Sequence, residues 1–211
     1  MKKFENFSIF ILIVFLTLII GSLSNYFLDT EQLLYNSLVE QLTQEQIEDM
    51  LVNKQKWKSI GYVIVPIILL IKFSTIAAIL DIGCFFFSKE IKYKKLFNIV
   101  VKAEFVFLLV IVFKTAWFYF FQTDYNLEDL QYFYPLSALN IIGYVDLQPW
   151  FIYPLQVFNL FELAYWVILA YFIGKELNEN TDKGFSIVAS SYGVSLLIWV
   201  VSVMFFTLNM S

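Results

Sequence analysis

Long apolar runs alternate with shorter polar segments along the chain. Each run reaches the roughly 20 residues that an α-helix needs to cross the hydrocarbon core of a bilayer, where every backbone polar group must be bonded within the helix. The pattern predicts an all-α, polytopic integral membrane helix bundle with about five transmembrane helices, in one membrane domain over residues 1–211. The predicted transmembrane helices cover residues 7–27, 60–87, 96–121, 150–173 and 185–208.

The segment 28–59, between the first two predicted transmembrane helices, has an amphipathic helical pattern. Thr43 and Gln46 form a capping box, in which two side chains satisfy reciprocal backbone donors at a helix start. Thr30 is suited to cap an earlier helix. We therefore expect a small extracytoplasmic helical loop whose second helix begins at Thr43 and ends near Lys54.

The segment 122–149 begins acidic and then becomes apolar from Tyr132 to Ile142. Its apolar part is too short to span a bilayer and is interrupted by Pro135 and Gly143. An interfacial or re-entrant segment is the predicted structure, and it would be a candidate mouth of a cavity. The alternative is an aromatic belt that rests at the lipid headgroups.

The lysines indicate an orientation, because cytoplasmic loops near membrane spans carry an excess of positive residues. With the amino terminus inside, the cytoplasmic segments hold eight lysines and the outside segments three. The sequence predicts a cytoplasmic amino terminus and an outside carboxyl terminus in a multi-pass protein of the bacterial inner membrane. The eight are Lys2, Lys3, Lys89, Lys92, Lys94, Lys95, Lys175 and Lys183, and the three are Lys54, Lys56 and Lys58.

Composition supports a membrane protein and removes several kinds of partner. Hydrophobic residues make up 60% of the chain and the mean hydropathy is +0.71, which leaves too little polar surface for a water-facing globule. The lipid bilayer is therefore a predicted partner. All basic residues are lysine, which excludes bidentate guanidinium recognition of nucleic acid, and histidine is absent, so we expect no cofactor and no metal site. The single cysteine, Cys84, is expected to pack as an apolar residue.

Charged residues inside membrane spans are a functional-site hypothesis by default. Lys72 and Glu162 each lie twelve residues from the outer end of their predicted helices, about 18 Å at 1.5 Å per residue, so we predict that they face the bundle interior and meet as an ion pair, directly or through water. Asp81 and Lys102 each lie six residues from the inner end, about 9 Å, which allows a second pair. The alternative for Lys102 is that its ammonium extends to the nearer interface. Structural and functional roles of these charges stay open.

Two further patterns concern helix shape and packing. Pro66 and Pro154 fall inside the second and fourth predicted helices, where each removes a backbone donor and can kink its helix. Small residues at helical spacing in the fifth predicted helix permit close helix contact. They are Ser186, Ala189, Ser190, Gly193 and Ser202.

Three stretches carry a family resemblance: Tyr93-Lys94-Lys95-Leu96-Phe97-Asn98-Ile99-Val100, Asn159-Leu160-Phe161-Glu162-Leu163-Ala164-Tyr165-Trp166, and Lys183-Gly184-Phe185-Ser186. With the order of basic segment, paired spans and acidic loop, residues 60–208 resemble the Yip-type (Ypt-interacting-protein-like) membrane proteins, whose eukaryotic members act in vesicle trafficking. The resemblance implies a five-span fold. Only six residues precede the first predicted helix, whereas the trafficking members have a long soluble amino-terminal region, so it does not imply a small-GTPase partner.

The chain has no nucleophile elbow, phosphate-binding glycine loop or thiol–imidazole pair, so we predict no catalytic residues. The leading hypothesis is a non-enzymatic accessory or scaffold subunit that binds lipid or other membrane proteins, including a second copy of itself. The alternative is a permease or channel component that uses Lys72 and Glu162. A membrane enzyme using Asp81 or Glu162 is a third. A water-connected cavity reaching Glu162 would favour transport, and a dry, paired core would favour the scaffold.

Overall fold

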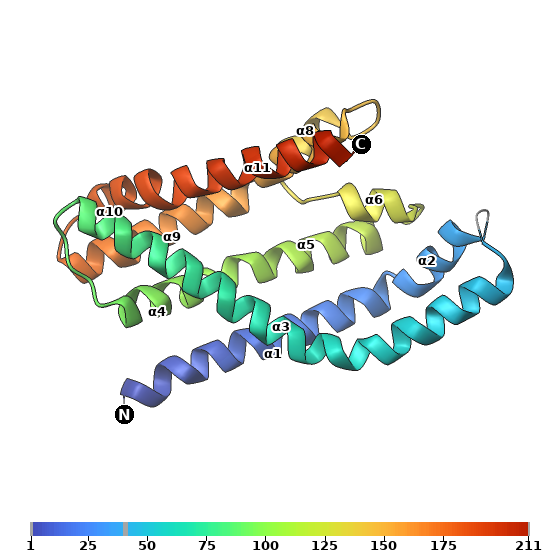
Figure 1. The fold of residues 1–211 in the computed structure, drawn as a ribbon, viewed down its shortest axis with the longest axis horizontal. Helices are drawn as coiled ribbons and strands as arrows, with labels where there is room; N and C mark the ends of the chain where they lie inside the picture. The colour runs from blue at the N-terminus through green and yellow to red at the C-terminus, as the bar shows by residue number, and fades with distance from the viewer. Residues whose placement is uncertain (1, 40–41, 211) are drawn as a thin grey trace.

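The computed structural model describes residues 2–39 and 42–210. Within these residues the chain is all-α, apart from one isolated antiparallel bridge between Ser137 and Asn159. The helices lie roughly along one axis and form an elongated bundle, in which the first helix begins toward one end and the last helix ends toward the other (Figure 1). The predicted all-α helix bundle is confirmed.

Among the described residues, four helical stretches are long and apolar enough to cross a membrane. They correspond to the first, second, third and fifth predicted transmembrane helices. Less than half of each stretch is buried inside the protein, so most of its apolar surface is available to lipid. The chain therefore has the build of a multi-pass membrane protein. The stretches are Ser8–Phe27, Ile60–Phe86, Tyr93–Phe120 and Thr181–Met210.

The chain begins with α1 (Lys2–Phe27), which is followed after a short turn by α2 (Thr30–Leu38). Asp29 occupies the turn in the left-handed region, with φ of 44°, and no side chain caps α2. The expected cap at Thr30 is therefore wrong, because Thr30 is already the first helical residue. The polar segment 28–59 does begin with a helix, as predicted.

One helix of 43 residues, α3 (Gln44–Phe86), returns along the bundle. It begins at the predicted capping box, where the Thr43 side chain accepts from the Gln46 backbone N–H and the Gln46 side chain accepts from the Thr43 N–H. The expected end near Lys54 is wrong, since the helix continues into the second transmembrane stretch. No proline lies between Lys54 and Pro66 to break it, and Figure 1 shows α3 bending between its two halves.

The third pass consists of α4 (Tyr93–Ala103) and α5 (Phe105–Phe120), which are joined at Glu104. There the Phe107 N–H donates to the Glu104 carbonyl at 2.9 Å, a tight i→i+3 turn within an otherwise α-helical pass. After it come two short helices, α6 (Leu127–Tyr132) and α7 (Ala138–Ile142), in the segment predicted to be interfacial or re-entrant.

The fourth predicted transmembrane helix, 150–173, is not one continuous helix. It is divided into α8 (Pro149–Val157) and α9 (Leu160–Leu177), and Asn159 is extended between them. The Asn159 side chain accepts from the Glu162 N–H at 2.8 Å, so it starts a new helix instead of continuing the old one. With three charged residues in 18, α9 is not among the four apolar stretches.

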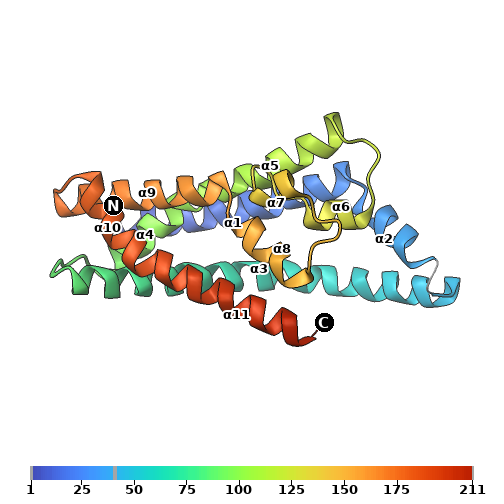
Figure 2. The same cartoon turned by 90° about the horizontal axis from the view of Figure 1, so that it is seen from above.

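The last pass contains α10 (Thr181–Val188), a π-helical turn η1 (Ala189–Gly193) and α11 (Val194–Met210). Helix α9 packs along α10, and α8 packs along α11. The division between α8 and α9 therefore matches the π-turn between α10 and α11, and the two broken passes lie side by side in both views (Figure 2).

The two ends of the bundle differ in charge. The turns after α3 and after α9 meet at one end, here called the lysine end, where ion pairs join Lys89 to Glu179 and Lys95 to Glu176. The hydrogen bond and charge of Lys89 hold the pKa of Glu179 below its usual range. The opposite end, here called the loop end, carries α2, α6 and α7 (Figure 2).

The core lies toward the lysine end, where α3, α4, α9 and α10 meet. Cys84 is buried in this core, as expected. Two glycines allow close helix contact: a Cβ at Gly184 would overlap the backbone of Ala170, and one at Gly193 would overlap the Trp166 ring. The predicted close packing of the last pass is confirmed at Gly193. Fully buried core residues include Phe73, Leu80, Leu96, Val100, Leu169, Ile173 and Ile187.

Candidate functional site

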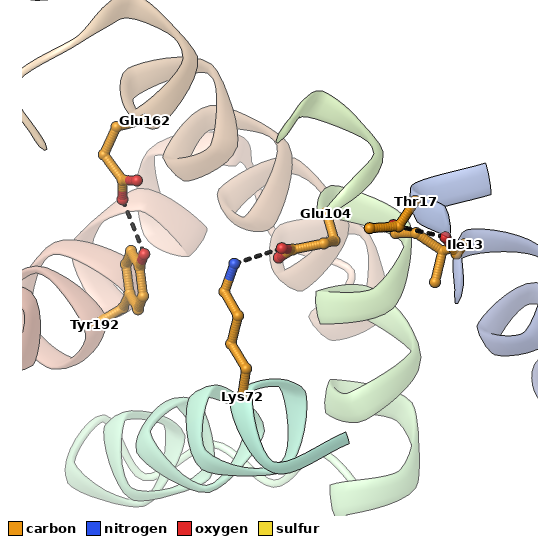
Figure 3. Close-up of polar contacts among 6 residues, drawn as sticks. All are labelled: Ile13, Thr17, Lys72, Glu104, Glu162 and Tyr192. Atoms are coloured by element: carbon orange, nitrogen blue, oxygen red, sulfur yellow. Dashed lines mark hydrogen bonds and ion pairs between the residues drawn. The ribbon is translucent and has the colours of Figure 1, made fainter. Parts of the chain in front are cut away.

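A partly buried ion pair joins the second and third passes. The Lys72 ammonium of α3 donates to Glu104 Oε1, at the junction of α4 and α5 (Figure 3). The Glu104 side chain is 7% exposed and that of Lys72 is 42% exposed. The ammonium also lies 4.8 Å from the centroid of the Phe107 ring, a favourable cation–π contact. The pair therefore links two consecutive passes through residues that are 32 positions apart.

Glu162 has neutral partners. Its Oε1 atom accepts from the Tyr192 hydroxyl at 2.8 Å (Figure 3). It also accepts from the Trp166 indole N–H at 2.9 Å. Trp166 lies one turn further along α9, and Tyr192 comes from η1 of the last pass. These two donors hold the carboxylate between the fourth and fifth passes. Glu162 also lies within electrostatic range of Lys72 and Glu104.

The predicted ion pair between Lys72 and Glu162 is wrong, because the direct partner of Lys72 is Glu104. Lys72 lies 14 residues from the end of α3 at Phe86, and Glu104 lies 11 residues from the start of α4 at Tyr93. The depth difference is about 4.5 Å at 1.5 Å per residue, which the long lysine side chain spans. The predicted pairing rested on matching the depth of Lys72 only with that of Glu162.

Asp81 and Lys102 do not form the predicted second pair. Both are exposed on the surface of the bundle, and the structure has no ion pair between them. The Lys102 ammonium instead lies 5.7 Å from the centroid of the Phe172 ring. Its long side chain reaches over an aromatic face near the lysine end, which agrees with the alternative of extension toward an interface.

A buried tyrosine lies within electrostatic range of both acidic groups. Tyr165 is fully buried, and its ring lies 5.0 Å from that of Phe107 and 5.5 Å from that of Tyr192, centroid to centroid. Neither its hydroxyl nor Glu104 Oε2 has a hydrogen-bond partner in the structure. Buried polar atoms without partners are uncommon in native proteins. Lys72, Glu104, Glu162, Tyr165 and Tyr192 form what we call the embedded cluster.

Backbone irregularities surround the embedded cluster. Glu104 lies at the α4–α5 junction, Tyr192 lies in the π-turn, and Glu162 lies in the first turn after the division between α8 and α9. Single π-turns inside α-helices occur frequently at functional sites. In membranes, interrupted helices are tolerated where protein or a cavity satisfies the backbone. The three acidic or phenolic groups are thus placed by three interruptions of regular helix.

A cavity of about 730 Å³ lies toward the loop end, next to this cluster. Its walls come from α5, from the segment between α6 and Tyr144, and from the start of α9. The predicted interfacial or re-entrant segment thus lines a cavity, as its broken apolar pattern suggested. Its lining includes Phe113, Trp117, Gln122, Asp129, Tyr132, Leu136, Ser137, Leu139, Ile141, Tyr144, Phe158, Asn159, Leu160 and Leu163.

Backbone hydrogen bonds fasten the cavity segment to the divided helix. The Ala138 N–H donates to the Phe158 carbonyl at 2.9 Å, and the Leu160 N–H donates to the Leu136 carbonyl at 3.2 Å. Asn159 is 5% exposed, and its amide donates to two α8 carbonyls at 2.8 and 2.9 Å. Two non-helical segments therefore satisfy each other, which makes the interruption stable in a buried position.

Polar groups lie at two places in the cavity wall. Ser137 is 2% exposed, and its hydroxyl has no hydrogen-bond partner in the structure. Toward the loop end, the Tyr144 hydroxyl donates to Asp129 Oδ1 at 2.7 Å. Accepting this bond, Asp129 raises the pKa of Tyr144 to about 12. The cavity thus combines apolar walls with a few fixed polar groups, the usual character of a small-molecule site.

Sequence reasoning missed Glu104 as the partner of Lys72 and did not single out Tyr165, Trp166 or Ser137. One signal was present: Tyr165 and Trp166 follow Glu162 at positions i+3 and i+4, the spacing of one helix face. Nothing in the sequence around Ser137 indicated that its hydroxyl would be buried. Among the described residues, no group of three or more His, Cys, Asp or Glu is placed to hold a metal ion.

Comparisons of the chain with protein-family models, with curated proteins and with solved structures find no match. The Yip-type resemblance therefore stays a prediction from the sequence. The cavity and the embedded cluster are the features on which a functional proposal rests.

Proposed function

We propose that this protein is a non-enzymatic membrane protein that binds a membrane lipid in the loop-end cavity, as an accessory or scaffold subunit. The cavity is the observation that supports this proposal. Its volume of about 730 Å³ falls in the usual range of ligand sites, roughly 300–1,000 Å³. That volume takes an acyl chain with part of a headgroup and leaves the rest of the lipid in the bilayer.

The rim of the cavity favours a ligand that enters from the bilayer. Ile141 is 89% exposed and Phe158 is 70% exposed, and both line the cavity. Such apolar surface is unfavourable in water and favourable against acyl chains. The buried Ser137 hydroxyl supplies a hydrogen-bonding group deeper in the wall.

Charge favours a lipid with an amine in its headgroup. The segment 122–149 contains four acidic residues and no lysine, and Asp129 lines the cavity. An anionic headgroup would be repelled there, whereas a zwitterionic ethanolamine headgroup places an ammonium against the acidic segment. The four acidic residues are Asp124, Glu128, Asp129 and Asp146.

Native mass spectrometry tests the proposal on protein extracted from membranes of mixed phosphatidylethanolamine and phosphatidylglycerol. The wild type should retain phosphatidylethanolamine in preference. The double variant Leu160→Trp, Leu163→Trp narrows the cavity and should lose it. Leu197→Trp, Ile198→Trp makes the same change on the exposed surface of α11 and should retain it. Equal retention by all three proteins, or equal retention of both lipids, contradicts the proposal.

A permease or channel component is the second candidate, and the embedded cluster favours it. In many transporters, interrupted helices place polar groups near the middle of the membrane. However, the cavity includes Leu163 but neither Glu162 nor Lys72 among its lining residues, so no open route to the charges supports transport. Ion flux in liposomes that changes in Glu162→Gln, with lipid retention unchanged, would favour this candidate.

We also propose the orientation and the partners that the sequence suggested. With the lysine end inside, the basic turns face the cytoplasm and the loop end faces outward. The hairpin of α2 and the first part of α3 would then be available to a membrane-protein partner or to a second copy of the chain. Membership of the Yip-type family is proposed in the same sense, supported by the five-pass order of the bundle.

A further inference from the structure

The embedded cluster has two carboxylates and one ammonium among its described side chains. Lys72 and Glu104 form a direct pair, which leaves Glu162 without a cation in direct contact. Lys102 and Lys114 are the nearest lysines on either side of Glu104 along the third pass. Lys102, two residues before Glu104, is exposed, and its ammonium lies over an aromatic ring. Lys114 lies ten residues after Glu104, about 15 Å along the helix. Neither makes an ion pair with another described residue, so neither balances the cluster.

The surroundings of Glu162 offer hydrogen bonds but no positive charge in contact. Tyr192 and Trp166 both donate to Oε1, and the carbonyl oxygen of a neutral carboxylic acid has two lone pairs with which to accept both bonds. Among the described residues, four other titratable groups lie in range of Glu162. They are Lys72 from the second pass, Glu104 from the third pass, Tyr165 from α9, and Tyr134 from the cavity segment. All the tyrosines are neutral near neutral pH.

We infer that the embedded cluster is a proton-binding site, in which Glu162 carries one proton on Oε2 while Glu104 stays ionised beside Lys72. The proton comes from water and is released to water, and no other bond changes. This balances the cluster at zero net charge within the membrane. The inference goes beyond lipid binding and does not depend on it.

Two neighbours bear on this proton. Leu163, the residue after Glu162, lines the loop-end cavity, whereas Glu162 itself is not among the lining residues. Tyr165, without a hydrogen-bond partner, packs between Phe107 on the side of Glu104 and Tyr192 on the side of Glu162. Its hydroxyl, which can both accept and donate, lies within electrostatic range of Glu104 and Glu162.

Infrared spectroscopy of the purified protein in nanodiscs tests the inference, because a protonated carboxyl group has a carbonyl stretch distinct from that of a carboxylate. With glutamate labelled by carbon-13, the wild type at neutral pH should show one protonated glutamate. Glu162→Gln should remove the signal. Glu104→Gln should also remove it, because Lys72 is then free to balance an ionised Glu162.

Removing the Lys72 ammonium should increase the signal of protonated glutamate instead of lowering it. Lys72→Met leaves two carboxylates without a cation and should add a second protonated glutamate of equal band area. Asp81→Asn removes an exposed carboxylate on the same helix and should leave the glutamate signal unchanged. Absence of a protonated glutamate in the folded wild type overturns the inference without any variant. A wild-type signal that survives in Glu162→Gln with the same area overturns the assignment to Glu162.

Discussion

The Lys72 ammonium and the Glu104 carboxylate are 32 positions apart in the chain and form an ion pair between the second and third passes (Figure 3). The acidic partner is almost fully buried, whereas the lysine is partly exposed. Substituting either residue alone therefore leaves the other charge without its partner. Glu104 pairs with a cation, whereas Glu162 accepts hydrogen bonds from neutral groups.

The ion pair predicts a recovery of stability on double substitution. Lys72→Met alone and Glu104→Gln alone should each lower the midpoint of thermal unfolding in detergent, and the double variant should regain much of the loss. Breaking a fully buried pair costs about 3–5 kcal/mol, and the partial exposure of Lys72 reduces that value here. Lys72→Met combined with Glu162→Gln is the control and should recover less. Equal recovery in both doubles would argue against a specific pair.

The hydrogen bonds of Asn159 at the division between α8 and α9 predict a loss of stability when its side chain is removed. Asn159→Ala should lower stability by more than the ~0.5–2 kcal/mol of a helix cap, because its amide also donates to two carbonyls of α8. Asn180→Ala removes the cap of α10 at an exposed position and should cost a value within that range. Unfolding monitored by circular dichroism compares the two variants. A larger loss in Asn180→Ala would contradict the buried role of Asn159.

Gly184 predicts sensitivity to a single methyl group. A Cβ there would overlap the carbonyl of Ala170 on the neighbouring helix, and backbone cannot move aside as a side chain can. Gly184→Ala should therefore cost about 1–3 kcal/mol or more. Gly61→Ala is the matched control, since nothing lies within 4 Å of its Cβ position, and it should be neutral or gain up to ~1 kcal/mol. Folded yield by size-exclusion chromatography checks both.

The hydrogen bond between Tyr144 and Asp129 predicts a pH dependence at the loop end. The pKa of the Tyr144 hydroxyl is raised from 10 to about 12 in the folded protein, so folding favours the neutral phenol. The stabilisation is fully present below pH 10 and should be lost as the pH rises toward 12. The difference in unfolding midpoint between the wild type and Tyr144→Phe should shrink over that window. A difference that stays constant would show that this bond does not titrate.

The lysine asymmetry predicts the topology. A reporter that is active only outside the cytoplasm should work when fused after Ser211, a residue outside the described part of the chain, and should fail when fused after Lys95. A cytoplasmic reporter at the same two positions should give the reverse result. Activity of the outside reporter at Lys95 alone would mean that the protein is inserted with the lysine end outward.

The sequence by itself determined the helices that depend on local chemistry. Runs of about 20 apolar residues have only helix available to them in lipid, so four of the five predicted spans appear as helical stretches long enough to cross a membrane. The capping box at Thr43 needs only two side chains three residues apart, and it was predicted at the correct position. These features require no knowledge of which helix neighbours which.

Only the tertiary structure decided which charges pair and how the backbone groups at the interrupted helix find hydrogen-bond partners. Depth along a helix says nothing about which face a residue occupies, so Lys72 and Glu162 share a depth but do not pair, and Glu104 takes the ammonium instead. The division at Asn159 depends on backbone bonds to a segment some twenty residues earlier, which no local pattern reveals. The same contacts create the cavity, because two non-helical segments can be buried only where they satisfy each other.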